Sequence, residues 1–508
     1  MKICLKIKRV LLLCFFLAFT NVVSKNASNN YSKFGRDKYD RLKGVTLHFS
    51  HVLPHNNGVK NKHILRKDWM FISLSNHEKC RTKTKKRKYT SFDGITSEHN
   101  AGTFQRGNIL CNKKMKLIIQ LLNRTKWYDF KFFSPAKINL FLRLKERKET
   151  HNEISTLMHS INLGDDIFIT SLSREDQRKL EKLLFPCQSG DFLTIKKTKE
   201  HDVLHENKIK CLWDKEKDEH YFYNNYPLND DNIIAKILKR YREELNINDD
   251  IKFLVHINKR SPIFSGIGGG SSNGASVFYF LENYFYKFLK TDQLRNEFLK
   301  KIGSDISFFS SSGFAYCTDK GNYVIDLIDA QATISDRRIY IFQINEGLSS
   351  KLVYQNVNYN NIVQYNPVSL LKHFIINPVG CNIINHIEEK EFNYLKHFVS
   401  FDHTELKNMF INDLEHSAFL LLKKVKYLKD FLMNQNIFDA VAMSGSGSSL
   451  FALTKKNMSL HKEKRHMKNL IKDVQRKLHL NIKAYLCSFL RKPKHLWYKP
   501  SQVAEMMA

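Results

Sequence analysis

Apolar positions repeat regularly along the chain from about residue 128 to about residue 490. Alternation of apolar and polar positions predicts strands at 136–142, 251–257 and 338–344. Helical spacing predicts helices at 232–245 and 275–289. The same criteria predict two strands around a turn at 164–166, a short helix before 303, a helix over 404–435, two strands around a turn over 443–453, a basic helix over 456–478 and a last strand at 481–488. Strands and helices mix irregularly, which indicates an α+β fold in two lobes.

Two segments inside this region lack a clear period. Residues 171–228 are polar and charged, and we interpret them as an insertion that leaves the core. Residues 356–400 are Asn-rich and loosely patterned. The sequence contains no repeat with a period of roughly 20–50 residues, which argues against solenoid and propeller architectures.

The first 127 residues differ in character from the rest. Residues 1–24 combine a basic start with an apolar run, Val10–Phe19, that is too short to span a bilayer, as in a signal peptide. Residues 25–127 are basic, rich in Asn and Ser and poor in acidic residues, which is typical of a disordered transit leader. Together they resemble the two-part address of a plastid reached through the secretory route, such as an apicoplast. This predicts a stromal protein with no stable membrane anchor after removal of the leader. The basic cluster at 81–88 also fits a nuclear-localisation or RNA-binding arm.

The charge of the chain is strongly positive but unevenly distributed. Among 508 residues, 82 Lys and Arg stand against 50 Asp and Glu, a formal net charge of +32. Such an excess is typical of nucleic-acid-binding proteins. However, residues 1–128 hold 27 of the basic and 6 of the acidic residues, so +21 of the excess belongs to the leader. The nine cysteines form no Cys-x-x-Cys pair, which argues against a zinc ribbon. We therefore expect no nucleic-acid partner.

A glycine-rich loop between a predicted strand and a predicted helix is the strongest chemical signal in the chain. Backbone N–H groups at the start of a helix carry partial positive charge, and glycine lets the backbone approach a ligand closely. The loop therefore predicts a phosphate-binding site. It is neither a Walker A loop nor a dinucleotide fingerprint, because the required endings are absent. The loop comprises Pro262, Ile263, Phe264, Ser265, Gly266, Ile267, Gly268, Gly269, Gly270, Ser271 and Ser272.

This loop resembles the hallmark of the GHMP kinases (galactose, homoserine, mevalonate and phosphomevalonate kinases), which is Pro-x-x-x-Gly-Leu-Gly-Ser/Gly-Ser-Ser at the start of a helix. Ile267 replaces the usual Leu. Three further segments agree with the family in the same order, namely Ser-Pro-Ala-Lys-Ile-Asn-Leu-Phe-Leu at 134–142, Gly-Ser-Asp-Ile-Ser-Phe-Phe at 303–309 and Met-Ser-Gly-Ser-Gly-Ser-Ser-Leu-Phe at 443–451. The resemblance covers about residues 130–455, and four ordered motifs are far more specific than one glycine loop.

The resemblance implies a two-lobed α+β fold. Its N-terminal lobe is expected to be ribosomal S5 domain 2-like, and its C-terminal lobe ferredoxin-like. We assign the ATP-binding lobe to 128–335, the C-terminal lobe to 336–490 and a tail to 491–508. The active site is then expected in the cleft between the lobes. Residues 445–448 either form the far wall of that cleft or are only a tight turn.

The resemblance also implies roles for particular residues. Asp305 is expected to act as the general base that accepts the proton of the substrate hydroxyl. Lys137 is expected to stabilise the developing alkoxide and to orient Asp305. Residues 262–272 are expected to bind the phosphates of ATP. Mg²⁺ is expected to arrive with ATP, with Ser272 as a contact, so the protein itself provides no metal site.

Within the family, the motifs are most similar to those of the branch that phosphorylates the 2-hydroxyl of 4-(cytidine 5'-diphospho)-2-C-methyl-D-erythritol (CDP-methylerythritol) in non-mevalonate isoprenoid synthesis. Asn139 is expected to line the substrate pocket. His151 and Asn152 stand where the branch has a Tyr that stacks on cytosine and a His that bonds to it. The alternatives are a kinase of the family acting on mevalonate or homoserine, or a binding protein that has lost catalysis. The protein is expected to be a monomer or a homodimer.

Overall fold

The computed structural model describes residues 112–123, 128–147, 152–197, 225–247, 250–286, 289, 291–378, 381–395, 398–401, 405–493 and 496–499. The chain divides into two compact units, residues 1–98 and 99–508, and all described residues belong to the second. The predicted signal peptide, most of the predicted leader and His151 lie outside the described residues. No described helix is long and apolar enough to cross a bilayer.

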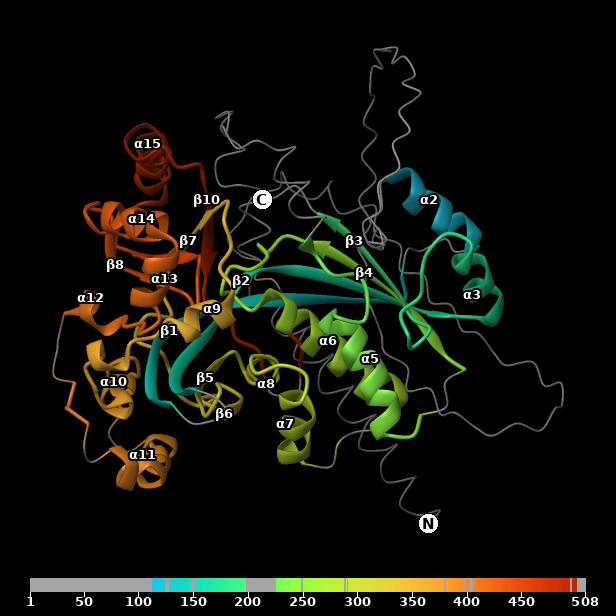
Figure 1. Cartoon of the computed structure of the whole chain (residues 1–508), viewed down its shortest axis with the longest axis horizontal. Coiled ribbons are helices and arrows are strands. Elements are labelled where there is room, and N and C mark those ends of the chain that lie inside the picture. Colours follow the sequence, from blue (N-terminus) through green and yellow to red (C-terminus); the bar gives the residue numbers. More distant parts are fainter. Residues whose placement is uncertain are drawn as a thin grey trace, which may run out of the picture. The chain divides into compact units, whose positions relative to one another are not determined.

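The described part of the N-terminal lobe is built on one mixed sheet (Figure 1). Its strands are β1 (Phe130–Arg147), β2 (Asn152–Leu172), β3 (Phe192–Lys197), β4 (Lys252–Lys259), β5 (Phe314–Thr318) and β6 (Tyr323–Asp326). They follow the order β3-β4-β2-β5-β6, with β1 also paired to β2. Only β3 and β4 pair in parallel; the other pairs are antiparallel.

Helices cover this sheet on the side where its apolar side chains gather. They are α5 (Ile233–Glu244), α6 (Gly269–Phe285), α7 (Asp292–Lys300) and α8 (Ile306–Phe309). Apolar side chains of α5 and α6 pack with those of β2, β3 and β4 in one buried cluster. Asn232 caps α5, because its side chain accepts a hydrogen bond from the Ile234 N–H. The predicted helix at 232–245 and strand at 251–257 are therefore confirmed.

The second sheet confirms the predicted ferredoxin-like topology. Its strands are β7 (Arg338–Ile344), β8 (Phe438–Met443), β9 (Leu450–Thr454) and β10 (Ile482–Ser488), in the spatial order β10-β7-β9-β8. All neighbours are antiparallel. In chain order this is 4-1-3-2, the arrangement of a split β-α-β. One face packs against α14 (Lys423–Met433) and α15 (Leu460–Leu478), and the other packs against β1 and β2.

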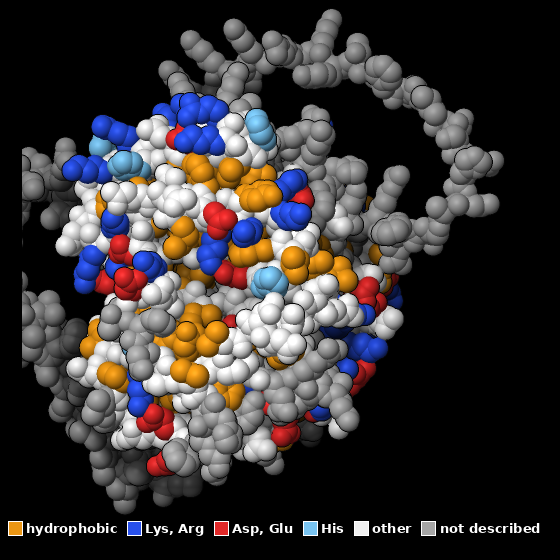
Figure 2. Space-filling model, turned by 60° about the vertical axis from the view of Figure 1, so that its left-hand side comes forward, with side chains coloured by type: hydrophobic (Ala, Val, Ile, Leu, Met, Phe, Trp, Pro, Cys, Tyr) orange, Lys and Arg blue, Asp and Glu red, His pale blue; other side chains and the backbone are white. Residues whose placement is uncertain are grey.

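The outer face of α15 carries many of the basic residues that remain outside the leader. Met467, Leu470 and Val474 are buried against the second sheet. Lys and Arg side chains gather on the outer side of this helix, at the top of Figure 2. The helix is thus amphipathic, with its charge in solvent.

Several sequence expectations are corrected. Gly164 is not a turn between two strands, because β2 runs through it. A register shift opposite Pro135 and Ala136 bulges β2 at this point. An added Cβ on Gly164 would lie 2.3 Å from the Ser134 carbonyl oxygen, so glycine permits the close approach of β1.

The predicted insertion at 171–228 contributes to the core. It contains α3 (Arg174–Glu181) and the sheet strand β3, whose Phe192, Leu193 and Ile195 are fully buried. The loosely patterned region 356–400 contains the 3₁₀ helix η3 (Tyr359–Asn361), α10 (Pro367–His373) and α11 (Asn382–Leu395), and α9 (Ser350–Gln355) precedes it. The single helix predicted over 404–435 is divided into α12 (Leu406–Met409), α13 (Glu415–Leu421) and α14.

The described part of the predicted tail packs against the fold. Trp497 and Tyr498 are buried against the N-terminal lobe. The Trp497 indole N–H donates to the Phe133 carbonyl at 2.9 Å, and the Tyr498 hydroxyl donates to the Ser311 carbonyl at 3.1 Å.

The last part of the predicted leader is folded. Helix α2 (Asn112–Leu121) places Met115, Ile118 and Leu122 in an apolar cluster. Their partners come from β2, the α3 region, β3 and β4, namely Leu172, Leu180, Leu184, Phe192 and Leu254. The lysines of this segment favour a disordered leader, so its composition did not indicate that these apolar side chains lie on one face of a helix.

Removal of α2 is therefore expected to destabilise the protein. A chain of residues 126–508 should have a free energy of unfolding roughly 2–4 kcal/mol lower than one of residues 112–508, since three buried side chains are lost and their partners become exposed. Urea denaturation of both proteins measures this. Equal midpoints would show that α2 contributes nothing to stability.

Two buried histidines are expected to make the fold sensitive to acid. Burial lowers the pKa of His159 to about 3 and that of His256 to about 4, against a usual value of 6.5. Below pH 6.5 the unfolded chain therefore binds more protons than the folded chain, and the free energy of unfolding decreases as the pH falls toward 4. Between pH 7 and pH 5 we expect a loss of about 2 kcal/mol per histidine.

Urea denaturation at the two pH values measures this loss. The His256→Gln variant should show about half of the wild-type loss, because one of the two titrating groups is gone. A loss of the same size in the variant would contradict the assignment to His256.

Candidate active site

The glycine-rich loop connects β4 to α6 as predicted, but the helix begins earlier than expected, at Gly269. Gly268 precedes it with φ 70°, a left-handed conformation that glycine adopts without strain. The loop borders a cavity of about 690 Å³. The cavity is lined by Lys137, Asn139, Leu142, Asn152, Ile154, Met158, Tyr226, Pro227, Asp231, Asn232, Ile233, Lys259, residues 262–271, Ser304, Asp305, Lys320, Ser350, Tyr354, Gly445 and Ser446.

The turn between β8 and β9 closes the cavity from the C-terminal lobe. The Ser444 hydroxyl donates to the Gly266 carbonyl at 3.1 Å, and the Ser449 N–H donates to the Ser265 carbonyl at 3.2 Å. Gly445 and Ser446 line the cavity. Of the two interpretations of this turn, the far wall of the cleft is therefore the correct one.

Lys137 and Asp305 meet in this cavity, although 168 residues separate them in the chain. Lys137 lies on β1 with only 3% of its side chain exposed, and Asp305 directly precedes α8 with 31% exposed. The Lys137 ammonium is 3.4 Å from the Asp305 carboxylate. It also donates to Asn139 Oδ1 at 2.6 Å. The Lys137 N–H donates to the Ile267 carbonyl at 2.9 Å, which ties this strand to the glycine-rich loop.

Asn139 is held in turn by β2. Its Nδ2 donates to the Thr156 hydroxyl at 2.8 Å, and that hydroxyl donates to the Phe141 carbonyl at 2.6 Å. The chain of hydrogen bonds fixes the side chain of Asn139 and, through it, the ammonium of Lys137.

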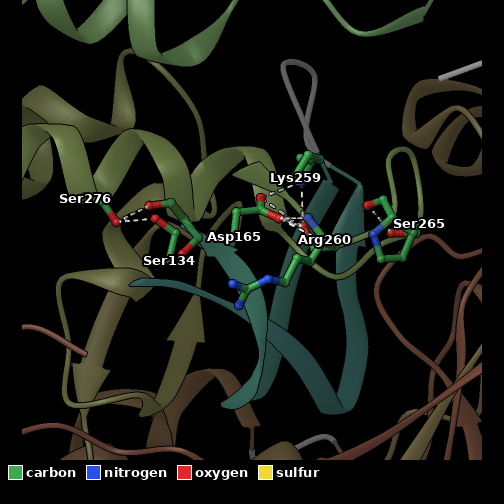
Figure 3. A network of polar contacts seen from close by, with 9 residues as sticks. Ser134, Asp165, Lys259, Arg260, Ser265 and Ser276 are labelled. Atoms are coloured by element: carbon green, nitrogen blue, oxygen red, sulfur yellow. Dashed lines mark hydrogen bonds and ion pairs between the residues drawn. The ribbon is translucent and has the colours of Figure 1, made fainter. Parts of the chain in front are cut away.

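Another ion pair, which is fully buried, supports the start of the loop (Figure 3). The Asp165 carboxylate accepts hydrogen bonds from the Lys259 ammonium at 2.6 Å, the Arg260 N–H at 2.9 Å and the Ser261 N–H at 2.8 Å. Lys259 lines the cavity, and an added Cβ on Gly269 would lie 2.9 Å from its ammonium. The positive charge of Lys259 thus lies beside the first residue of α6.

Sequence reasoning missed Lys259. The available signal was a lysine at the last position of a strand directly before the glycine-rich loop. Its partner Asp165 lies 94 residues earlier, within a strand that was read as a turn.

The other predicted site residues are placed as follows. Residues 262–271 line the cavity, whereas Ser272 does not; its side chain is buried, and its hydroxyl has no partner among the described residues. Asn152 lines the cavity, and its Oδ1 accepts a hydrogen bond from the Tyr359 hydroxyl at 2.7 Å. His151 lies outside the described residues.

Sequence reasoning also missed the aromatic residue at this end of the cavity. Tyr354, at the end of α9, lines it together with Asn152 and Asp305. Burial raises the pKa of the Tyr354 hydroxyl, and the negative charge of Asp305 raises it further. The phenol therefore stays neutral at physiological pH. Tyr354 lies between the predicted strand at 338–344 and the Asn-rich segment 356–400, where the sequence pattern predicts no element.

The composition of the cavity fits a magnesium ion that is brought by a nucleotide. Among the described residues, no three His, Cys, Asp or Glu side chains cluster as metal ligands. Magnesium commonly binds through one or two protein oxygens and the phosphates of a substrate. Ser271 offers such an oxygen at the edge of the cavity, and the buried Ser272 hydroxyl beside it is unpaired among the described residues.

Comparison with known proteins agrees with this site. The family model "GHMP kinases N terminal domain" matches residues 232–313, which contain α5, β4, the glycine-rich loop, α6 and Asp305. Over this region the chain is similar to the GHMP kinases. The chain is 28% identical over 337 residues to a 4-diphosphocytidyl-2-C-methyl-D-erythritol kinase of Protochlamydia amoebophila, covering 66% of this chain and 88% of that protein.

Two further proteins give matches of the same kind. The chloroplastic 4-diphosphocytidyl-2-C-methyl-D-erythritol kinase of Arabidopsis thaliana is 29% identical over 326 residues, covering 64% of this chain and 67% of that protein. A crystal structure of 4-(cytidine 5'-diphospho)-2C-methyl-D-erythritol kinase has a TM-score of 0.45 and 17% identity, covering 71% of this chain and 99% of that one.

Proposed function

We propose that this chain is a kinase that transfers the γ-phosphoryl group of ATP to the 2-hydroxyl of CDP-methylerythritol, giving the 2-phosphate and ADP. The observation that carries the proposal is the Lys137–Asp305 pair in the same cavity as the glycine-rich loop. The names of the two curated relatives support the choice of substrate. The reaction belongs to isoprenoid precursor synthesis by the non-mevalonate pathway.

The phosphates of ATP bind at the start of α6. The free N–H groups of its first turn and the helix dipole favour negative charge. Lys259 adds a cation there, and its pairing with Asp165 fixes where that charge lies. Ser271, which lines the cavity, would be the protein contact of Mg²⁺, and the ion would neutralise phosphate charge there.

The acceptor hydroxyl binds beside Asp305. Asp305 accepts the hydroxyl proton while the oxygen attacks the γ-phosphorus, and the bond from that phosphorus to the oxygen shared with the β-phosphate breaks. ADP leaves with that oxygen. Lys137 stabilises the negative charge that develops on the acceptor oxygen, and Asn139 holds the ammonium in place.

The cytosine base of the substrate binds at the Asn152 end of the cavity. The ring of Tyr354 offers an aromatic face for stacking, and the Asn152 amide offers hydrogen bonds to the base edge. We assign a second stacking role to His151, which directly precedes Asn152 in the chain.

The N-terminal segments serve targeting in this proposal. Residues 1–24 act as a signal peptide, and the basic segment that follows directs the protein to a plastid stroma through the secretory route. Similar plant kinases are named as chloroplastic proteins, which supports a plastid location. The catalytic protein then comprises an ATP-binding lobe up to about residue 335 and a C-terminal lobe after it, as a monomer or homodimer.

A coupled ADP-release assay on residues 112–508 tests the function. CDP-methylerythritol, mevalonate, homoserine and galactose are compared at equal ATP and Mg²⁺. We expect turnover of CDP-methylerythritol alone. Turnover of mevalonate or homoserine instead would assign the chain to another branch of the family. ATP binding without any turnover would indicate a binding protein.

A further inference from the structure

A hydrogen bond across the cleft fixes the amide of Asn152. Asn152 is the first residue of β2, and Tyr359 begins the 3₁₀ helix η3, which is 207 residues away in the chain. The Tyr359 hydroxyl donates to Asn152 Oδ1 at 2.7 Å. Tyr359 does not line the cavity, and its ring packs against the core of the C-terminal lobe. Its hydroxyl is therefore held from behind the cavity wall by a packed element.

This bond determines which end of the Asn152 amide is available to a ligand. The carbonyl oxygen is occupied by Tyr359, and no other described residue hydrogen-bonds to this side chain. The remaining group is the NH₂, which has two donors and no acceptor. Asn152 therefore presents donors to whatever binds at this end of the cavity.

Cytosine and uracil differ in the hydrogen-bonding group that they present to such a donor. Cytosine has two adjacent acceptors, N3 and O2, whereas uracil carries an N–H donor at N3. Both bases keep the acceptor O2, so only an NH₂ group that faces N3 discriminates. Such a group pairs with cytosine N3 but meets the uracil N3–H donor to donor, which leaves polar groups unpaired. A freely rotating amide would turn its oxygen toward the uracil N–H and accept both bases.

We propose that Tyr359 is a positioning residue that makes the enzyme selective for a cytidine over a uridine diphosphate substrate, by holding the Asn152 amide with its NH₂ group toward the base. This inference rests on the proposed function. Tyr359 touches neither substrate nor the reacting atoms, so its effect should appear in the recognition of the base and not in phosphoryl transfer.

The experiment measures kcat/KM of the 112–508 protein for CDP-methylerythritol and for its uridine counterpart. In Tyr359→Phe the ratio of the two values should fall by at least about tenfold. The change should lie in the two KM values, with kcat for the cytidine substrate and KM for ATP nearly unchanged. Tyr427→Phe serves as the matched control, because Tyr427 on α14 is 52% exposed and does not line the cavity.

A double-mutant cycle separates positioning from a general structural effect. In an Asn152→Ala background, Tyr359→Phe should no longer change the ratio, because the amide through which it acts is absent. The same fall in both backgrounds would overturn the proposal. An unchanged ratio in the single variant, or a wild type that uses both substrates equally, would also overturn it.

A failure of the proposed function can be distinguished from a failure of the proposed role of Tyr359. If the wild type binds ATP but turns over neither nucleotide substrate, the assigned reaction is wrong and the role of Tyr359 falls with it. If Tyr359→Phe does not fold, the ratio in Asn152→Ala decides, since selectivity that survives loss of the amide contradicts the proposal.

Discussion

Asn in place of Asp305 is expected to lower kcat for CDP-methylerythritol by about a thousandfold, within the range for loss of a general base. The two side chains have nearly the same shape, so the fold and the ATP site should be preserved. Asn cannot accept the hydroxyl proton at neutral pH, and this step is therefore lost. ADP release under saturating substrates measures kcat, and nucleotide titration measures ATP affinity, which should stay within about threefold.

Lys137→Ala should have an effect of similar size for a different reason. It removes the cation 3.4 Å from Asp305 and leaves Asn139 Oδ1 without its 2.6 Å donor. Because the two residues act as one unit on the acceptor hydroxyl, the double variant should be little slower than either single variant. Full additivity of the two losses would argue that they act in separate steps.

Asp292→Asn is the matched control for these variants. Asp292 lies in the first turn of α7 with 69% of its side chain exposed, and it pairs with Arg295 on the surface. Exposed pairs contribute about 1 kcal/mol or less, so kcat and stability should hardly change. Retention of more than about a tenth of wild-type kcat in Asp305→Asn would show that another group takes the proton.

Much of the fold can be predicted from local sequence, because the spacing of apolar residues and the residues that begin or end an element agree. Residues 338–344 alternate strictly, and the structure has β7 at Arg338–Ile344. Asn232 is a good helix cap, and α5 begins at the next residue. Such elements need no information from the rest of the chain.

The errors arose where tertiary contacts override local preference. Glycine and two aspartates after an apolar run predict a turn at Gly164. In the structure Asp165 is buried and paired with Lys259, and the strand continues through it. The basic segment at 112–121 was assigned to a disordered leader, yet Met115 and Ile118 fall on one helical face that packs against the N-terminal lobe.

The candidate active site likewise has residues that local motifs predict and residues that only tertiary contacts bring to it. Motifs identified Lys137, Asp305 and the glycine-rich loop, because these residues stand in short, ordered segments. Tyr354 and Tyr359 were not found, because they reach the cavity region from a part of the chain without any pattern. Their roles depend on the docking of the C-terminal lobe, which no local pattern reports.

Gly266→Ala is expected to damage the ATP site more than any other single change in the loop. Gly266 has φ 75°, and an added Cβ would lie 2.1 Å from the Ser444 carbonyl oxygen. This neighbour is backbone and cannot turn away, so the loop must move off the turn between β8 and β9. The hydrogen bonds from Ser444 and Ser449 to the loop would then break.

The displaced loop should bind ATP poorly. A shift of about 1 Å in a positioning element can cost about a hundredfold in rate, and we expect kcat/KM for ATP to fall by about that factor. The free energy of unfolding should decrease by roughly 3 kcal/mol, from backbone strain and lost contacts between the lobes. ADP-release kinetics and urea denaturation measure the two effects.

Gly270→Ala provides the comparison for stability. Gly270 lies in the first turn of α6, and the nearest atom to an added Cβ, Ile233 Cδ1, is 3.8 Å away, an ordinary contact. Alanine should therefore be tolerated there and should raise the free energy of unfolding by about 0.5–1 kcal/mol, since glycine loses more chain entropy on folding. A lower free energy of unfolding in Gly266→Ala and a higher one in Gly270→Ala would locate the damage at the contact between the loop and the C-terminal lobe. Wild-type ATP kinetics in Gly266→Ala would instead mean that this contact does not shape the phosphate site.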